Sequence, residues 1–251
     1  MIIPINTPLW MLAIACAFAV IIGKEIFGGT GMNIFNPALV ARAFLFFSYP
    51  TMMSGDSVWV ANDTIFGMGY VLADGTTAAT PLGIVAQTGS TGTELYDAII
   101  GFIPGSIGEP SVIAIAVGAV ILLWSGIASW RIMLSVFVGG GLTAALLASA
   151  GMDAATYPSA SIGLQHLVYG GFAFGAVFMA TDPVTSCRTN RGQYIYGLLI
   201  GFVAIIVRVM NPGYPEGMML AILLMNMFAS TIDHYVVDAN IRKRAKRANK
   251  Q

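Results

Sequence analysis

The residues best suited to covalent chemistry form one hydroxyl-rich segment, residues 74–82, whose sequence is DGTTAATPL. It holds one carboxylate, three threonine hydroxyls and, apart from Leu82, otherwise small or turn-forming side chains, so we expect its hydroxyls to be open to another molecule. From residue types alone, the simplest interpretation is a flexible threonine-rich loop. These residue types therefore identify a hydroxyl-bearing loop, and they do not identify a particular reaction.

Three carboxylates lie in or beside strongly apolar segments: Glu25, Glu109 and Asp233. An ionised group is costly in a membrane and is seldom kept there without a function. Carboxylate and backbone carbonyl oxygens are the ligands that a hard cation prefers, so we treat these residues as candidate cation ligands. The structural alternative is that Glu25 pairs with Lys24 or Arg42, and that Asp233 lies among lipid headgroups near Arg242.

The sulfur and imidazole groups do not form a metal-binding pattern. Cys16 and Cys187 are far apart in the sequence and show neither metal-ligand nor disulfide spacing. We interpret Cys16 as membrane packing and Cys187 as a free loop thiol. His166 and His234 each stand alone, which favours a structural role over metal binding.

Composition shows what kind of protein carries these residues. Hydrophobic residues make up 57% of the 251-residue chain and charged residues 10%, and the mean hydropathy is +0.78. Soluble domains are about 25% charged, so the chain is predicted to be an integral membrane protein. Its zero formal net charge argues against a nucleic-acid partner. No Gly-x-Gly-x-x-Gly fingerprint follows a strand, so we do not expect this chain to bind NADH itself.

Eight apolar runs are candidates to cross or enter the bilayer: residues 9–23, 37–49, 99–107, 111–128, 132–150, 164–180, 192–210 and 217–237. The run at 99–107 is far shorter than the roughly 20 residues of a full span and contains Pro104, so we predict a half-helix there. Glycines interrupt the run at 164–180 and precede the run at 37–49. Irregular backbone is tolerated at membrane depth only where it is buried in protein or lines a cavity. The sequence thus predicts an all-α, multi-span bundle with broken helices.

A weak internal repeat accompanies the two glycine-rich breaks. Residues 33–39, NIFNPAL, and residues 178–184, FMATDPV, both place Asn or Asp before Pro after a largely apolar stretch. We expect Asn36 to cap the helix that follows, with Pro37 at its first position. Common ancestry of the two segments and chance similarity both fit this pattern.

The distribution of Lys and Arg predicts the orientation of the bundle. Residues 241–247, IRKRAKR, are the most basic segment, and we place them in the cytoplasm in preference to assigning them to a nucleic acid. Alternating the spans back from this tail puts the other basic loop residues on the same side: Lys24, Arg131, Arg188 and Arg191. Residues 52–96 then form a long periplasmic loop that carries the hydroxyl-rich segment.

That segment resembles the flavinylation motif in the B subunit of the sodium-pumping NADH:quinone oxidoreductases. The motif runs Asp, two variable residues, Ser or Thr, a small residue, Ala and Thr, and its last Thr bonds to the phosphate of FMN. The matching positions are Asp74, Thr77, Ala79 and Thr80. The resemblance makes Thr80 the FMN acceptor, while Ala78 stands where glycine is commonest. Small neighbours let such a loop enter the site of a flavin transferase, and Asp74 could help it to dock.

The resemblance extends along essentially the whole chain. It is carried by residues 23–31, 36–39, 42–47, 53–56, 105–109, 128–133, 170–175, 178–183, 208–212, 215–223 and 239–241. The D subunit of the Rnf electron-transport complex is similar in fold and carries the same kind of flavin threonine. The segments at 42–47 and 53–56 favour the sodium-pump subunit over it.

The resemblance implies a urea-transporter-like bundle in the bacterial inner membrane, acting as one subunit of a translocase. Such a complex moves electrons from NADH to ubiquinone, partly through the covalent FMN, and exports sodium. In this setting the expected cation of Glu25, Glu109 and Asp233 is sodium, with Asp233 preferred for uptake from the cytoplasm. Arg42 or Arg208 would balance the flavin phosphate, unless helix N-termini do so. The alternative from another class is a channel or transporter without flavin.

The sequence differs from this family in one large respect. The family subunit has a further block of membrane helices before the region seen here, whereas this chain reaches its first helix directly after Pro8. We expect residues 1–251 to form a single membrane domain that is a fragment or the product of a shortened gene. The family's second flavin, riboflavin, and its quinone site depend partly on that block, so the resemblance leaves both open.

Overall fold

The computed structural model describes residues 3–4, 7–53, 58–59, 77–78, 80–88, 95–106, 108–151, 163–211 and 217–249. These residues are mostly helical, with one antiparallel pair of two-residue strands, β1 (Val58–Trp59) and β2 (Thr77–Ala78). The longer helices are α1 (Leu9–Gly23), α2 (Pro37–Ser48), α6 (Val112–Trp124), α7 (Trp130–Ser149), α10 (Asn190–Met210) and α11 (Met218–Ala248). Shorter helices are η1 (Glu25–Phe27), α3 (Pro50–Met53), α4 (Pro81–Thr88), α5 (Leu95–Ile100), η3 (Gly163–Leu167), α9 (Phe172–Phe174) and η4 (Gly175–Met179).

Within the described residues, four helical segments are long and apolar enough to cross a membrane: Leu9–Phe27, Trp130–Ser149, Asn190–Met210 and Met218–Ala248. Helices α2 and α6 are apolar but shorter. Many large apolar side chains of these helices point outward, including Val117, Leu142 and Phe202, as expected where lipid takes the place of water. The prediction of an all-α membrane bundle is confirmed.

Glycines let helices α7 and α10 approach each other closely. A methyl group added at Gly201 would collide with the backbone of Val136 and Gly140, and one added at Gly139 would collide with the backbone of Leu198. Small residues at such positions are the usual means of bringing membrane helices together, because the two backbones can then touch. Apolar residues of α7, α10 and α11 beside this glycine seam belong to one hydrophobic core cluster.

The run predicted at 164–180 is broken, as expected. The chain passes from the 3₁₀ turn η3 into the short helix α9 and then into η4, a π-helix that begins at Gly175. The positive φ of Gly170, 66°, separates the first two of these pieces. Most of the side chains of α9 and η4 are buried, so the irregular backbone is enclosed by protein.

The half-helix predicted at 99–107 is wrong. Helix α5 ends at Ile100, and residues 101–106 follow without helical structure. Gly101 has φ of 111°, and the amides of Gly101 and Phe102 both donate to the carbonyl oxygen of Asp97, which is a common way for a helix to stop. The predicted loop at 52–96 is also less uniform than expected, since β1, β2 and α4 lie within it.

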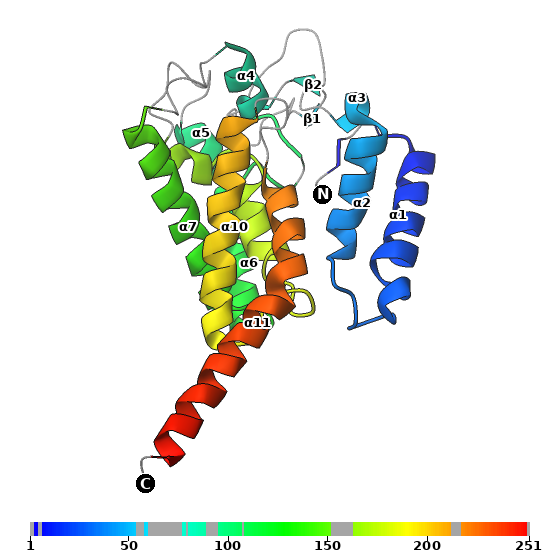
Figure 1. Ribbon diagram of the computed structural model, residues 1–251. Coiled ribbons are helices and arrows are strands. Elements are labelled where there is room, and N and C mark those ends of the chain that lie inside the picture. The colour runs from blue at the N-terminus through cyan, green and yellow to red at the C-terminus, as the bar shows by residue number, and fades with distance from the viewer. Residues whose placement is uncertain are drawn as a thin grey trace.

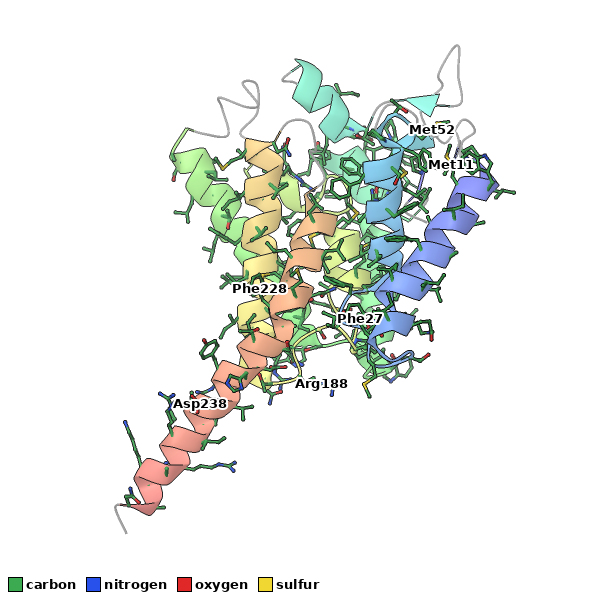
Figure 2. All side chains as sticks on the ribbon, turned by 45° about the vertical axis from the view of Figure 1, so that its right-hand side comes forward. Met11, Phe27, Met52, Arg188, Phe228 and Asp238 are labelled. Atoms are coloured by element: carbon green, nitrogen blue, oxygen red, sulfur yellow. The ribbon has the colours of Figure 1, made fainter. Side chains whose placement is uncertain are left out.

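The two ends of the bundle differ in character (Figure 1). Helices α3, α4 and α5 and the strands gather at one end, while α11 extends beyond the other. In Figure 2, Met11 and Met52 lie at the first end, and Phe27 and Arg188 lie at the second. The Ser129 hydroxyl donates to Gln193 Oε1 at 2.8 Å, so the loop before α7 also belongs to the second end. We call the first the loop end and the second the basic end; the basic loop residues share the basic end, as the charge pattern predicted.

Candidate functional site

Thr80 is the residue immediately before helix α4. Its side-chain oxygen accepts a hydrogen bond from the Gly83 amide at 3.1 Å, and its carbonyl oxygen accepts one from the Ile84 amide at 2.9 Å. Pro81 follows as the first helical residue, where its fixed φ and missing N–H cost nothing. Thr80 is therefore an N-cap, and its oxygen lies at the positive end of the helix dipole.

The half-buried Thr80 side chain faces a narrow pocket at the loop end. The pocket is lined by Thr80, Pro81, Leu82, Ile103, Pro104, Gly105, Glu109, Pro110 and Gly170. It thus brings together α4, the irregular stretch after α5 and the break before α9. Among the described residues that line the pocket, Thr80 and Glu109 are the ones with polar side chains.

Two arginines lie close to this pocket. Arg42 on α2 pairs with Glu109 at 3.6 Å, and both side chains are buried. Arg208, near the end of α10, is fully buried and donates to the His166 carbonyl oxygen at 2.6 Å. A methyl group added at Gly170 would lie 2.5 Å from Leu82 Cδ1 and 3.5 Å from Arg208 Nη2, so Arg208 is a near neighbour of the start of α4.

The rest of the flavinylation motif is only partly described. Asp74 and Ala79 lie outside the described residues, and Thr77 belongs to β2, where it pairs with Trp59. The side-chain contacts that the motif would make with another protein therefore stay a prediction. The position of Thr80 at a helix start is the part that the structure defines.

Asp233 lies at the opposite, basic end and holds the start of α10. Its carboxylate accepts from the Arg188 amide at 2.7 Å, the Thr189 amide at 3.1 Å and the Thr189 hydroxyl at 2.5 Å. The position of Asp233 among lipid headgroups near Arg242 stays a prediction. Arg242 itself pairs with Asp238 at 2.8 Å, because those two residues are one helical turn apart.

A cavity of about 340 Å³ lies beside Asp233. Its lining comes from three parts of the chain, namely the loop before α2, the loop before α10 and the middle of α11: Asn33, Ile34, Val184, Thr185, Ser186, Arg188, Asn226, Ala229, Ser230 and Asp233. The lining residues thus include side chains with hydroxyl, amide, carboxylate and guanidinium groups. The two Asn-Pro and Asp-Pro segments thus meet at the basic end, as the charge pattern placed them.

Both segments also use the same local bond. Asn36 Oδ1 accepts from the Ala38 amide at 3.0 Å, and Asp182 Oδ1 accepts from the Val184 amide at 3.1 Å. The predicted cap of α2 is therefore present. Their common ancestry stays a hypothesis, because an Asx side chain before proline makes this turn readily wherever it occurs.

Asn226 is a polar residue of this cavity that the sequence analysis did not single out. It is 2% exposed, and its Oδ1 accepts from the Tyr196 hydroxyl at 2.6 Å. Its Nδ2 has no hydrogen-bond partner in the described part of the chain. A lone amide in the apolar run of α11 was the available signal, because polar groups in membrane helices are costly.

The three candidate carboxylates do not converge. Glu25 is exposed on η1, Asp233 holds the loop before α10, and Glu109 lies at the loop end. Arg42 pairs with Glu109, so the proposed pairing of Arg42 with Glu25 is wrong. No group of three or more His, Cys, Asp or Glu side chains that could hold a metal ion occurs among the described residues.

Cys187 is not an accessible loop thiol. It is 1% exposed, and its Sγ donates to the Ala229 carbonyl oxygen at 3.2 Å. Burial, and after it the negative charge of Asp233, raises the pKa of this thiol to about 12. Cys16, in contrast, is exposed on α1.

A model of the NQR2, RnfD, RnfE family matches residues 1–242. The chain belongs to this family. The family assignment made from the sequence is confirmed, and the family includes both the sodium-pump subunit and the Rnf subunit that was its alternative.

Curated relatives in this family are similar over nearly the whole chain. The B subunit of the Na(+)-translocating NADH-quinone reductase of Chromohalobacter salexigens is 52% identical over 254 residues. The subunits of the same name from Ectopseudomonas mendocina and Klebsiella pneumoniae are each 49% identical, over 253 and 257 residues. Each alignment covers 98% of this chain but only 58%, 60% and 59% of the respective relative. The chain thus spans somewhat under two thirds of the length of these relatives.

Proposed function

We propose that this chain is a membrane subunit of a sodium-translocating NADH:quinone oxidoreductase, carrying FMN on Thr80 and coupling electron transfer toward ubiquinone to sodium export. The supporting observation is the position of Thr80. The residue that completes the flavinylation motif is also the N-cap of α4, so its oxygen lies where a helix attracts negative charge. The relatives named as B subunits of such reductases support the choice of complex.

The residues around Thr80 fit a phosphoester-linked flavin. The Thr80 side chain is half-buried and lines a narrow pocket of about 10 Å³, which holds no more than a water molecule, so the flavin would lie outside it. An ester oxygen at the position of the Thr80 hydroxyl can still accept from the Gly83 amide. Arg42 and Arg208 supply positive charge nearby, while Glu109 supplies one negative charge that Arg42 balances. When bound, FMN would supply one- and two-electron redox chemistry; the residues of this chain would hold its phosphate and exclude water from one side.

The basic end is proposed to serve sodium uptake, with Asp233 as the first candidate. Thr185, Ser186, Ser230 and Asp233, all with side-chain oxygens, are among the residues that line the same cavity, and oxygen ligands suit a hard cation. Glu25 is exposed on η1 near the same end, and Glu109 lies by the pocket of Thr80. If all three carboxylates contribute to sodium passage, they do so at separate points along the bundle.

Riboflavin, the family's second flavin, is an alternative occupant of the cavity at the basic end that is proposed above for sodium. The volume of about 340 Å³ is in the range of small-molecule sites. The buried Asn226 Nδ2 offers a hydrogen-bond donor without a protein acceptor in the described residues. We propose this cavity as the region to examine for a non-covalent flavin, in the inner membrane and with the other subunits of the complex present.

Substitutions at Thr80 test the proposal. With a flavin transferase co-expressed, the wild-type chain should carry a flavin that survives denaturation, and mass spectrometry should place FMN on the peptide that contains Thr80. Thr80→Ser keeps the hydroxyl and should keep flavin. Thr80→Asn keeps a good N-cap for α4 but removes the hydroxyl, so it should lose the flavin completely. Covalent FMN on the Thr80→Asn peptide would refute the assignment.

The two alternatives make different predictions in the same experiment. A flavin-free channel or transporter would show no ultraviolet-excited fluorescence in the denatured wild-type band. An Rnf-type subunit would carry the flavin but would not restore NADH-dependent quinone reduction when it is assembled with the other subunits of the sodium pump. NADH-dependent quinone reduction in that assembled complex separates these cases.

A further inference from the structure

Helix α11 continues well past the bundle. Its 31 residues correspond to about 46 Å of helix, whereas the hydrocarbon core of a bilayer is about 30 Å thick. Every residue from position 239 to position 249 is exposed, and this part projects away from the other helices (Figure 1). The last turns of α11 therefore lie outside the hydrocarbon core as a continuation of a membrane-spanning helix.

The projecting part is strongly basic. Its cationic residues within the described helix are Arg242, Lys243, Arg244, Lys246 and Arg247. Arg242 is engaged by Asp238. No ion pair joins the other four to the part of the chain that the structure describes, so their charge is available to a partner.

One face of the same helix is apolar. With about 100° between successive residues, Val237, Ile241, Ala245 and Ala248 fall along a single narrow stripe, and the basic side chains occupy the remaining faces. Val237 is 45% exposed and Ile241 is 59% exposed. A helix with a narrow apolar stripe and a broad basic face is typical of segments that lie in the boundary layer of a membrane.

Aromatic residues indicate that this helix emerges at headgroup level. Trp130 and Tyr194, at the basic end, pack edge to face at 6.1 Å, and Arg131 lies 5.3 Å from the Trp130 ring. Tyr235, on α11 two residues after Asp233, is 69% exposed. Tryptophan and tyrosine gather where membrane meets water. The basic segment thus begins where lipid phosphates are found.

We propose that residues 237–248 of α11 lie along an anionic lipid surface, with Val237 and Ile241 facing the acyl chains and the lysines and arginines contacting phosphate headgroups. The stripe contains two alanines and is too small for the large, regularly spaced anchors that a protein groove takes from a helix. Each basic residue near an anionic leaflet strengthens the attraction about fivefold. This surface is independent of the function proposed above.

A polarity-sensitive dye on the full chain tests the proposal. The dye is attached at Ala245→Cys in a background with Cys16→Ser and Cys187→Ser, and the protein is placed in nanodiscs of phosphatidylcholine alone or mixed with phosphatidylglycerol. We expect the emission to shift to the blue, with protection from a water-soluble quencher, only in the discs that contain phosphatidylglycerol. Raised salt should reverse the effect, because it screens exposed charges.

Two matched sets of substitutions give the controls. Replacing Lys243, Arg244, Lys246 and Arg247 by Gln preserves helix propensity and should lower the preference for the lipid-bound position more than a hundredfold. The control set replaces the four basic loop residues at the basic end by Gln: Lys24, Arg131, Arg188 and Arg191. It should leave the dye signal unchanged.

Equal emission in both kinds of disc would overturn the proposal. So would a tail that becomes protected only when partner subunits or RNA are added, because that result would make it a protein- or nucleic-acid-binding arm.

Discussion

At the scale of single residues, Thr80 and Asp233 share one structural role: the side chain of each accepts hydrogen bonds from backbone amides at or just before the start of a helix. Thr80 accepts from Gly83 in the first turn of α4. Asp233 accepts from Arg188 and Thr189 just before α10. A residue proposed for chemistry therefore also has a structural role in each case, and its substitution must be designed to separate the two.

Asp233→Asn is expected to weaken sodium uptake. The change keeps the size of the side chain and one oxygen but removes the charge that favours a hard cation. In the assembled complex, the sodium concentration for half-maximal quinone reduction should rise several-fold, while the oxidation of NADH, which we assign to another subunit, should be unchanged.

Thr189→Val provides the matched control for this prediction. It removes the hydroxyl that donates to Asp233 but leaves the carboxylate in place. A rise in the sodium requirement as large as that of Asp233→Asn would assign the effect to the loop before α10. An unchanged requirement in Asp233→Asn, Glu25→Gln and Glu109→Gln would make all three carboxylates structural.

Cys187 should be almost inert in the folded protein. Burial and the charge of Asp233 raise its pKa to about 12, so the thiol stays almost entirely protonated at neutral and mildly alkaline pH and the reactive thiolate is scarce. In a Cys16→Ser variant, maleimide labelling at pH 8 should be negligible before denaturation and complete after it. Rapid labelling of the folded chain would show that the loop before α10 is open to solvent.

At the scale of elements, the sequence predicted the long helices and failed at their interruptions. Apolar runs near 20 residues identified α7 and α10 because membrane spans must satisfy their backbone internally. The end of α5 was missed because it depends on the left-handed conformation of Gly101. The sequence shows that a glycine is present but not which φ it adopts. The burial of Arg208 could not be predicted either. It donates to the His166 carbonyl oxygen, and this acceptor is a backbone atom of a distant segment.

The seam between α7 and α10 should not tolerate an added methyl group. In Gly201→Ala the new Cβ would meet the backbone of Val136 and Gly140, and backbone atoms cannot rotate aside. We expect a loss of about 1–3 kcal/mol or more in stability, measured as a lower thermal transition in detergent. Gly118→Ala is the control: the atoms nearest to its methyl group belong to the ring of Phe178, which can shift, so a loss as large as that of Gly201→Ala would contradict the importance of the seam.

At the scale of the whole molecule, the prediction still to be tested is the orientation of the bundle in the membrane. We expect the loop end to face the periplasm and the basic end the cytoplasm. The chain offers exposed positions at both ends: Met52, Ser125, Asn211 and Asn240. In a background without Cys16 and Cys187, an impermeant thiol reagent should label Cys variants at Met52 and Asn211 in cells with a permeabilised outer membrane, and should spare those at Ser125 and Asn240.

Cys187 is removed from this experiment because its side chain is buried. It would escape labelling on either side of the membrane, so its lack of labelling would not indicate where it lies. The reverse labelling pattern would contradict the orientation. It would also remove the access of Thr80 to a flavin transferase outside the cytoplasm.

The placement of Thr80 and Asp233 at opposite ends limits how electron transfer and sodium movement can influence each other. Helix α10 runs from Thr189, beside Asp233, to the neighbourhood of Arg208, beside the start of α4, and these 19 residue steps span about 28 Å. Two unit charges at that separation interact by only about 0.6 kcal/mol at an effective dielectric constant of 20. If the flavin is on Thr80 and sodium enters by Asp233, direct attraction is too weak to link them tightly. The link would then require a change in shape carried along α10 and α11.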